Sequence, residues 1–259
     1  MSVLDGPREE WRRILHEGHP QWVKPAGDKL ILGDGRVVPE ASATYLPPCD
    51  PTKILCIHLN YESRRVEFRA PMLETPTYFQ KPTTALNSHR GSLCRPAGHK
   101  FLNYEGEVGV IIGKPMRNVG REQAWYYIAG FAPANDVGCQ DYRETDAGSM
   151  LRVKGQDGFC PIGPGIVSGV DIRTSTLRTY IDGKVVQDGP RWRDAGHVRR
   201  DQTRAPRAAA SLPCAVATAD GAAAGAVPRT GCDLAAGLAA ANVPSANGRR
   251  ASTASPALA

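Results

Sequence analysis

Two glutamates stand at the start of one of the most apolar segments of the chain. Side chains of an extended chain alternate between two faces, so Glu105 and Glu107 share one face. Val108, Val110 and Ile112 then lie on the other face, toward the core. Two like charges this close repel unless a cation lies between them, and a hard divalent cation such as Mg²⁺ or Mn²⁺ is the simplest partner. Taken alone, the pattern is more typical of a solvated strand edge.

The apolar spacing near the N-terminus predicts a small subdomain. Trp11, Ile14 and Leu15 recur at three- and four-residue spacing, which predicts a capped amphipathic helix. Residues 29–38 alternate around a glycine-rich turn and predict a hairpin. Several prolines near residue 50 then mark a linker. Residues 1–50 are therefore predicted to form a small helix/hairpin subdomain.

The chain from residue 51 to residue 189 reads as the main, β-rich domain. Strand-like composition alternates with turn residues, one short helical pattern and one polar loop. The Asp182-Gly183 turn marks the strongest hairpin, because this pair supplies the positive φ angles of a tight turn. The predicted strands are 53–57, 78–82, 105–112, 126–131, 150–154, 177–181 and 184–187; the helical pattern is 119–125 and the loop 141–148.

Composition limits the possible classes of protein. With 259 residues, of which 41% are hydrophobic, the chain can bury a core large enough for an enzyme. The absence of an apolar run of about 18 residues and of a signal-peptide core predicts a cytoplasmic protein with no membrane partner. Seven cysteines, without a C-x-x-C pair, favour neither a disulfide framework nor a zinc site.

The basic character of the chain is concentrated after residue 189. Residues 190–259 contain nine Arg and four Asp and so carry +5 of the net charge of +6. The remainder is close to neutral, and no nucleic-acid partner is expected. The same segment is nearly one-third Ala and contains no Ile, Lys, Phe, Tyr, Met or Glu. This composition predicts a disordered, low-complexity tail that does not build a packed sheet.

An ordered set of short motifs resembles the fumarylacetoacetate hydrolase superfamily. It is most similar to the branch that includes 5-carboxymethyl-2-hydroxymuconate isomerase and decarboxylase. Each motif alone is weak, but their order and spacing together are specific. The motifs are Asn60-Tyr61, Phe79 with Lys81-Pro82, Tyr104-Glu105-x-Glu107, Ile112-Gly113-Lys114, Gly130-Phe131 with Asn135-Asp136, Lys154 with Asp157, Pro161 and Gly163-Pro164, and Asp182-Gly183-x-x-x-Gln187.

The resemblance implies an α+β, mostly β fold: a mixed-sheet β-roll with a small N-terminal domain, assembled as a homodimer. It implies Mg²⁺ or Mn²⁺ as cofactor, and it implies roles for individual residues. Lys154 matches an active-site lysine whose ammonium group offsets charge on an enolate oxygen. The implied metal ligands are Glu105, Glu107 and Asp136, and the implied substrate contacts are Asn60, Tyr61 and Gln187.

The sequence departs from the family pattern at two positions near the expected site. The family's flap carries a His–Glu pair; Glu67 matches the glutamate, but Arg64 stands at the histidine position and cannot act as a base near neutral pH. Glu67 then acts alone or through a water. His58 is interpreted as an ordinary strand histidine. Gln140 replaces an arginine, and Arg143 either binds a substrate carboxylate in its place or has a surface role.

The region after Gly189 is a third departure. The family continues with further strands and a Gly-Thr-Pro type motif, which is not found here. The residue types missing from 190–259 are largely those with AT-rich codons, so we hypothesise that the tail is a frameshifted, non-native reading of a GC-rich gene. Sequencing the gene around the Gly189 codon tests this hypothesis. An intact frame, with no alternative frame encoding Gly-Thr-Pro and an apolar strand, would contradict it.

Three classes of function follow. The favoured one is a metal-dependent enzyme of aromatic-compound catabolism that acts on 2-oxo or 2-hydroxymuconate-type acids through a metal-stabilised enolate, as an isomerase or decarboxylase. Hydrolysis of a C–C bond in acylpyruvates is the alternative reaction of the same site. The second class is an inactive, truncated relative. The third is a binding protein with a basic tail.

Overall fold

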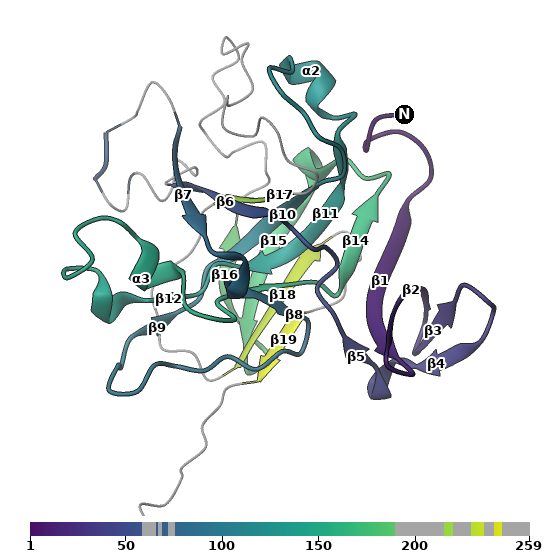
Figure 1. Cartoon of the computed structure of the whole chain (residues 1–259), viewed down its shortest axis with the longest axis horizontal. Coiled ribbons are helices and arrows are strands. Elements are labelled where there is room, and N and C mark those ends of the chain that lie inside the picture. The colour runs from purple at the N-terminus through teal and green to yellow at the C-terminus, as the bar shows by residue number, and fades with distance from the viewer. Residues whose placement is uncertain are drawn as a thin grey trace, which may run out of the picture.

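The computed structural model describes residues 1–58, 66, 69–71 and 76–189, together with three strands within 190–259. It consists mainly of β-strands, which curl around a common core (Figure 1). This confirms the predicted class, a mostly β fold with a mixed-sheet β-roll. None of the helices in this described part is long and apolar enough to cross a membrane.

The first strands of the chain form one edge of a 13-stranded sheet. The expected hairpin at residues 29–38 is present. The strands are β1 (Glu9–His16), β2 (His19–Ala26), β3 (Lys29–Leu32), β4 (Val37–Pro39) and β5 (Thr44–Tyr45), with the 3-10 helix η1 (Glu40–Ser42) before β5. Because β1 also pairs with β14 (Gly165–Ser168), this region continues directly into the main sheet.

The predicted N-terminal amphipathic helix is wrong, because residues 9–16 form a strand. Arg12 and Ile14 face inward and are 5% and 1% exposed, whereas Trp11 and Leu15 face outward. An apolar spacing of three and four residues fits a helix, but β2 and β14 hydrogen-bond to both edges of this segment and hold it extended. Local spacing was overridden by partners distant in sequence.

The remaining strands of the main sheet surround β10 (Gly106–Ile112) and β11 (Ile128–Asn135), which pair antiparallel. The sheet order is β4-β3-β2-β1-β14-β11-β10-β17-β6-β7. The predicted strands at 53–57 and 78–82 and the short helix near 121–124 are confirmed. The other elements up to residue 168 are β6 (Lys53–His58), β7 (Thr77–Lys81), η2 (Thr83–Ala85), β8 (Leu86–Ser88), β9 (Leu102–Asn103), α2 (Arg121–Ala124), β12 (Gly138–Cys139), η3 (Gln140–Tyr142), α3 (Leu151–Lys154) and β13 (Cys160–Ile162).

Strand β10 is buried on both faces. Val108 packs in a cluster with Phe131 and Val167 on one face, as the alternation predicted. Ile111 packs in a second cluster, with Ile54 and others, on the opposite face. The strand therefore lies inside the fold, and the residues at its start are held by core on both sides.

The predicted strand at residues 150–154 is wrong, because residues 151–154 form the single-turn helix α3. Asp146 Oδ2 accepts hydrogen bonds from the backbone N of Arg152 at 2.9 Å and of Val153 at 3.5 Å. These bonds satisfy amide groups at the start of the turn. The sequence feature that indicates this helical turn is Asp146, several residues upstream. A search for alternating apolar and polar residues does not detect it.

The expected hairpin at residues 177–187 is confirmed by β15 (Thr176–Ile181) and β16 (Lys184–Gly189), after the 3-10 helix η4 (Ile172–Thr174). Asp182 and Gly183, in the turn, have φ angles of 49° and 75°. Both angles lie in the left-handed region that a tight two-residue turn requires. The strongest turn signal in the sequence thus set the hairpin register locally.

Three strands lie within the predicted disordered tail: β17 (Ala215–Ala219), β18 (Arg229–Ala235) and β19 (Ala241–Pro244). β17 lies between β10 and β6, and β18 pairs with β15. The disordered, low-complexity character expected for residues 190–259 as a whole stays a prediction. The facing edges of β6 and β10 carry backbone groups that require a partner, and β17 supplies it. The frameshift hypothesis remains a prediction.

Candidate active site and metal centre

The site is built where β10 begins and β11 ends. Antiparallel pairing places Gly106 opposite Asn135, so Glu105, just before β10, meets Asp136, just after β11. The backbone N of Asp136 donates to Glu105 O at 2.8 Å. Glu105, Glu107 and Asp136 are 7%, 0% and 0% exposed. The interpretation of the glutamate pair as a solvated strand edge is therefore wrong.

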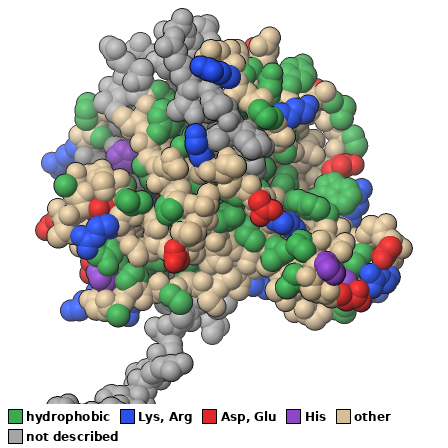
Figure 2. Space-filling model, in the orientation of Figure 1, with side chains coloured by type: hydrophobic (Ala, Val, Ile, Leu, Met, Phe, Trp, Pro, Cys, Tyr) green, Lys and Arg blue, Asp and Glu red, His purple; other side chains and the backbone are tan. Residues whose placement is uncertain are grey.

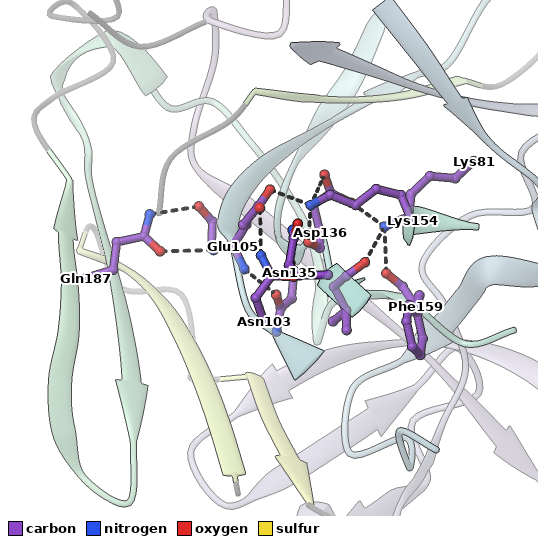
Figure 3. Close-up of polar contacts among 11 residues, drawn as sticks. Lys81, Asn103, Glu105, Asn135, Asp136, Lys154, Phe159 and Gln187 are labelled. Carbon is purple, nitrogen blue, oxygen red and sulfur yellow. Dashed lines mark hydrogen bonds and ion pairs between the residues drawn. The ribbon is translucent and has the colours of Figure 1, made fainter. Parts of the chain in front are cut away.

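Lys154 joins two of these carboxylates. Its Nζ atom lies 2.6 Å from Glu105 Oε2 and 3.1 Å from Asp136 Oδ2, and it donates to Asp136 O at 2.9 Å (Figure 3). The lysine is 2% exposed and projects from α3. The structure thus brings together Glu105, Asp136 and Lys154, which lie up to 49 residues apart in sequence.

Sequence reasoning gave no role to Lys81, although its motif was noted. Lys81 lies at the end of β7 and is fully buried. Its Nζ atom forms an ion pair with Asp136 Oδ1 and donates to Phe159 O at 2.8 Å and Val137 O at 3.2 Å. The sequence feature that could have indicated this role is the position of Lys81 in a strand with the apolar pair Tyr78-Phe79. A lysine buried in such a strand needs an acidic partner in the interior.

Lys154 and Lys81 keep the carboxyl group of Asp136 ionised. Burial by itself raises the pKa of a carboxyl group, but the positive charges of Lys154 and Lys81 outweigh burial and lower the pKa of Asp136 below its ordinary value. Asp136 is therefore an ionised carboxylate in the interior. It can act as an acceptor and as a ligand for a cation.

Amide side chains hold Glu105 from two directions. Asn103 Nδ2 donates to Glu105 Oε1 at 2.8 Å, and Gln140 Nε2 donates in turn to Asn103 Oδ1 at 3.3 Å. Asn135 Oδ1 accepts from the backbone N of Glu105 at 3.0 Å. Gln140, at the position where the family usually has arginine, therefore supports Glu105 through Asn103.

His58 lies at the end of β6, within electrostatic reach of the same cluster. Burial lowers the pKa of its imidazole, the charges of Arg143 and Lys154 lower it further, and Glu105 and Asp136 act in the opposite direction. The His58 ring meets the ring of Phe79 edge-on, at 6.5 Å between centroids. His58 is a residue of strand β6, as interpreted, and the charges of the cluster act on it. Both roles considered for Arg143 remain open.

Of the expected substrate contacts Asn60, Tyr61 and Gln187, the structure describes only Gln187. The side-chain amide of Gln187 bonds to the backbone of Gly106, with Oε1 accepting from N at 2.9 Å and Nε2 donating to O at 3.0 Å (Figure 3). Its substrate role remains a prediction. Asn60, Tyr61 and Glu67 lie outside the described residues, as does Arg64.

The donor set fits a hard divalent cation. Glu105, Glu107 and Asp136 offer only carboxylate oxygens, the ligands that Mg²⁺ and Mn²⁺ prefer. Among the described residues, however, no three His, Cys, Asp or Glu side chains are grouped closely enough to hold a metal ion. Lys154 Nζ lies between Glu105 and Asp136 instead.

Comparison with known proteins decides the family. Residues 53–194 match the family model described as fumarylacetoacetate (FAA) hydrolase C-terminal. The chain belongs to the fumarylacetoacetate hydrolase family. The match confirms the resemblance and includes every site residue discussed above. Members of this family are enzymes, among them isomerase/decarboxylases and hydrolases.

A curated relative in the fumarylacetoacetate hydrolase family is the 4-hydroxyphenylacetate degradation bifunctional isomerase/decarboxylase of Salmonella dublin. It is 35% identical over 180 residues, which cover 68% of this chain and 41% of the enzyme. The chain spans less than two thirds of the length of the curated relatives it matches. The likeness therefore concerns one portion of those proteins.

Solved structures of other proteins share the fold of this chain. The 5-carboxymethyl-2-hydroxymuconate delta-isomerase of Mycobacterium smegmatis is 26% identical, with a TM-score of 0.74, over 91% of this chain and 98% of that one. Maleylpyruvate hydrolase of Sphingobium sp. SYK-6, in complex with manganese(II) and pyruvate, gives a TM-score of 0.67 at 19% identity, over 92% and 98% of the two chains. The second likeness concerns the fold alone.

Proposed function

We propose that the protein is a divalent-metal-dependent enzyme that acts on 2-oxo or 2-hydroxymuconate-type dicarboxylic acids through an enolate, as an isomerase or decarboxylase of aromatic-compound catabolism. The observation that carries the proposal is the buried grouping of Glu105, Asp136 and Lys154 in a chain of this family. Charges are costly to bury, and clusters of buried charged groups are concentrated at functional sites.

Glu105, Glu107 and Asp136 would hold the cation, Mg²⁺ or Mn²⁺. When bound, a divalent cation polarises the oxygen atoms of a 2-oxo acid and makes the neighbouring C–H bond more acidic. Lys154 places a fixed positive charge beside these carboxylates, where it stabilises negative charge that develops on a substrate oxygen. Burial strengthens this attraction, because little water screens it. Lys81 and Asn103 orient Asp136 and Glu105.

The remaining roles are proposed from the sequence. Glu67 is the proton acceptor, alone or through a water, and Asn60, Tyr61 and Gln187 contact the substrate. Arg143 binds a substrate carboxylate; its charge acts on His58 and so lies near the cluster, which supports this role. We further propose a homodimer in the cytoplasm that associates with neither nucleic acid nor membranes.

Hydrolysis of a C–C bond in an acylpyruvate is the second candidate. The fold shared with maleylpyruvate hydrolase supports it. Both reactions form an enolate that is finally reprotonated, but they form it differently. In the first case deprotonation or loss of CO₂ produces it; in the second, water adds to the distal carbonyl and the C–C bond then breaks to release it. The sequence-based preference for the isomerase/decarboxylase rests on the resemblance to that branch of the family and on Arg64, which cannot activate water as a base. An inactive relative is the outcome if neither reaction occurs.

Metal binding and turnover together test the proposal. The purified full chain is titrated with Mn²⁺ and then assayed, with Mg²⁺ or Mn²⁺, on a panel of 5-carboxymethyl-2-hydroxymuconate and acylpyruvates, with products identified by NMR. We expect Glu107→Ala to abolish both binding and turnover, and Glu122→Ala, an exposed change on α2, to leave both unchanged. Absence of Mn²⁺ binding, or binding unaffected by Glu107→Ala, would rule out the proposed enzyme.

A further inference from the structure

The amide group of Gln187 occupies the place of a neighbouring strand at the start of β10. It bonds to both backbone groups of Gly106, accepting from N at 2.9 Å and donating to O at 3.0 Å. A strand residue forms this pair of bonds with a residue on the next strand. Here a side chain of β16 supplies them, which extends the sheet by one amide group on the side of β10 that faces away from β11 (Figure 3).

Gly106 is the residue between the two glutamates. On the β11 side, the preceding residue is held as well: Glu105 N donates to Asn135 Oδ1 at 3.0 Å, and Glu105 O accepts from Asp136 N at 2.8 Å. The backbone N and O atoms of Glu105 and Gly106 are thus fixed from opposite sides. Movement of this peptide would shift the Glu105 and Glu107 side chains relative to each other.

A buried hydroxyl group orients the Gln187 amide. Thr179, opposite Gln187 in the β15/β16 hairpin, is fully buried and donates from Oγ1 to Gln187 Oε1 at 2.8 Å. Because a hydroxyl donor selects the amide oxygen, it fixes which end of the amide faces Gly106 N. Oε1 thus accepts hydrogen bonds from Gly106 N and Thr179 Oγ1, which engage both of its lone pairs.

We propose that Gln187 and Thr179 are positioning residues, which hold the Gly106 peptide so that Glu105 and Glu107 are spaced to bind a divalent cation. The proposal rests on the proposed metal-dependent function. It assigns to Gln187 a role behind the carboxylates, in addition to the substrate contact proposed above. It also gives the β15/β16 hairpin a function: it braces the start of β10.

The test measures the affinity of the full chain for Mn²⁺, from the electron paramagnetic resonance signal of free Mn²⁺. Gln187→Met keeps a similar length and removes the three hydrogen bonds described above; Gln123→Met makes the same change on exposed α2. We expect Gln187→Met to weaken Mn²⁺ binding by about 10- to 100-fold, the usual effect of losing a group that supports a ligand. Gln123→Met is expected to bind as the unsubstituted chain does.

The outcomes separate this inference from the function on which it rests. If the unsubstituted chain binds no Mn²⁺, the proposed metal function fails. If it binds Mn²⁺ and a folded Gln187→Met variant binds within twofold of it, the positioning role is overturned. If Gln187→Met does not fold, as judged by circular dichroism, Thr179→Val is measured instead. Weakened binding in that variant supports the role, and unchanged binding overturns it.

Discussion

Lys81 and Asp136 form an ion pair in which neither side chain has any exposed surface. The two residues are 55 positions apart, at the ends of β7 and β11. The ion pair joins the end of β7 to Asp136, one of the proposed metal ligands. Its strength bears on both the stability of the fold and the geometry of the site.

Replacing Lys81 by methionine is expected to destabilise the protein strongly. The change leaves Asp136 buried with one lysine in place of two, and removing one partner of a buried pair costs on the order of 3–5 kcal/mol. The free energy of unfolding, measured by urea denaturation, checks this. Lys29→Met, an exposed change on β3, is the control and is expected to stay within about 0.5 kcal/mol. Equal stability of the two variants would contradict the importance of the ion pair.

His89 is expected to make the fold sensitive to acid. Burial, aided by the charges of Arg90 and Arg12, lowers the pKa of His89 from 6.5 to about 4. As pH falls below 6.5, the unfolded chain binds a proton that the folded chain does not, so stability falls between pH 6.5 and pH 4. The loss attributable to this residue is up to about 3 kcal/mol.

Urea denaturation at pH 7 and pH 4.5 measures this effect. His89→Gln is expected to lose less stability between these pH values than the unsubstituted chain, since it has no imidazole to titrate. His19→Gln, at an exposed position, is expected to keep the full dependence. If His89→Gln retains the full dependence, other groups cause the loss.

His58 is expected to titrate below its ordinary pKa in the metal-free protein, because it is half-buried and feels the charges of Arg143 and Lys154. Arg143→Met removes a positive charge and is expected to raise the pKa of His58. Glu105→Gln removes a negative charge and is expected to lower it further. NMR titration of the imidazole protons checks both directions. A pKa unaffected by both changes would show that His58 lies outside the electrostatic reach of the cluster.

Much of the framework follows from local sequence. The Asp182-Gly183 turn, the hairpin at residues 29–38 and the alternation through β10 depend on residues a few positions apart, and all three were predicted. The proposed metal ligands follow from the family motifs, which place carboxylates at particular positions along the chain. Glu105 and Asp136 then proved to be adjacent in the fold.

The sequence by itself determined the hairpin turns, several of the strands and the family. The tertiary structure decided that β1 is a strand, that α3 is a helical turn, that Lys81 pairs with Asp136, and that Gln187 bonds to Gly106. Three of these depend on a partner that only folding brings close: β14 for β1, and strands more than 50 residues away for Lys81 and Gln187. The helical turn α3 depends on Asp146, which lies six residues before Arg152. Local patterns carry no information about such partners, because burial and hydrogen bonding are set where distant segments meet.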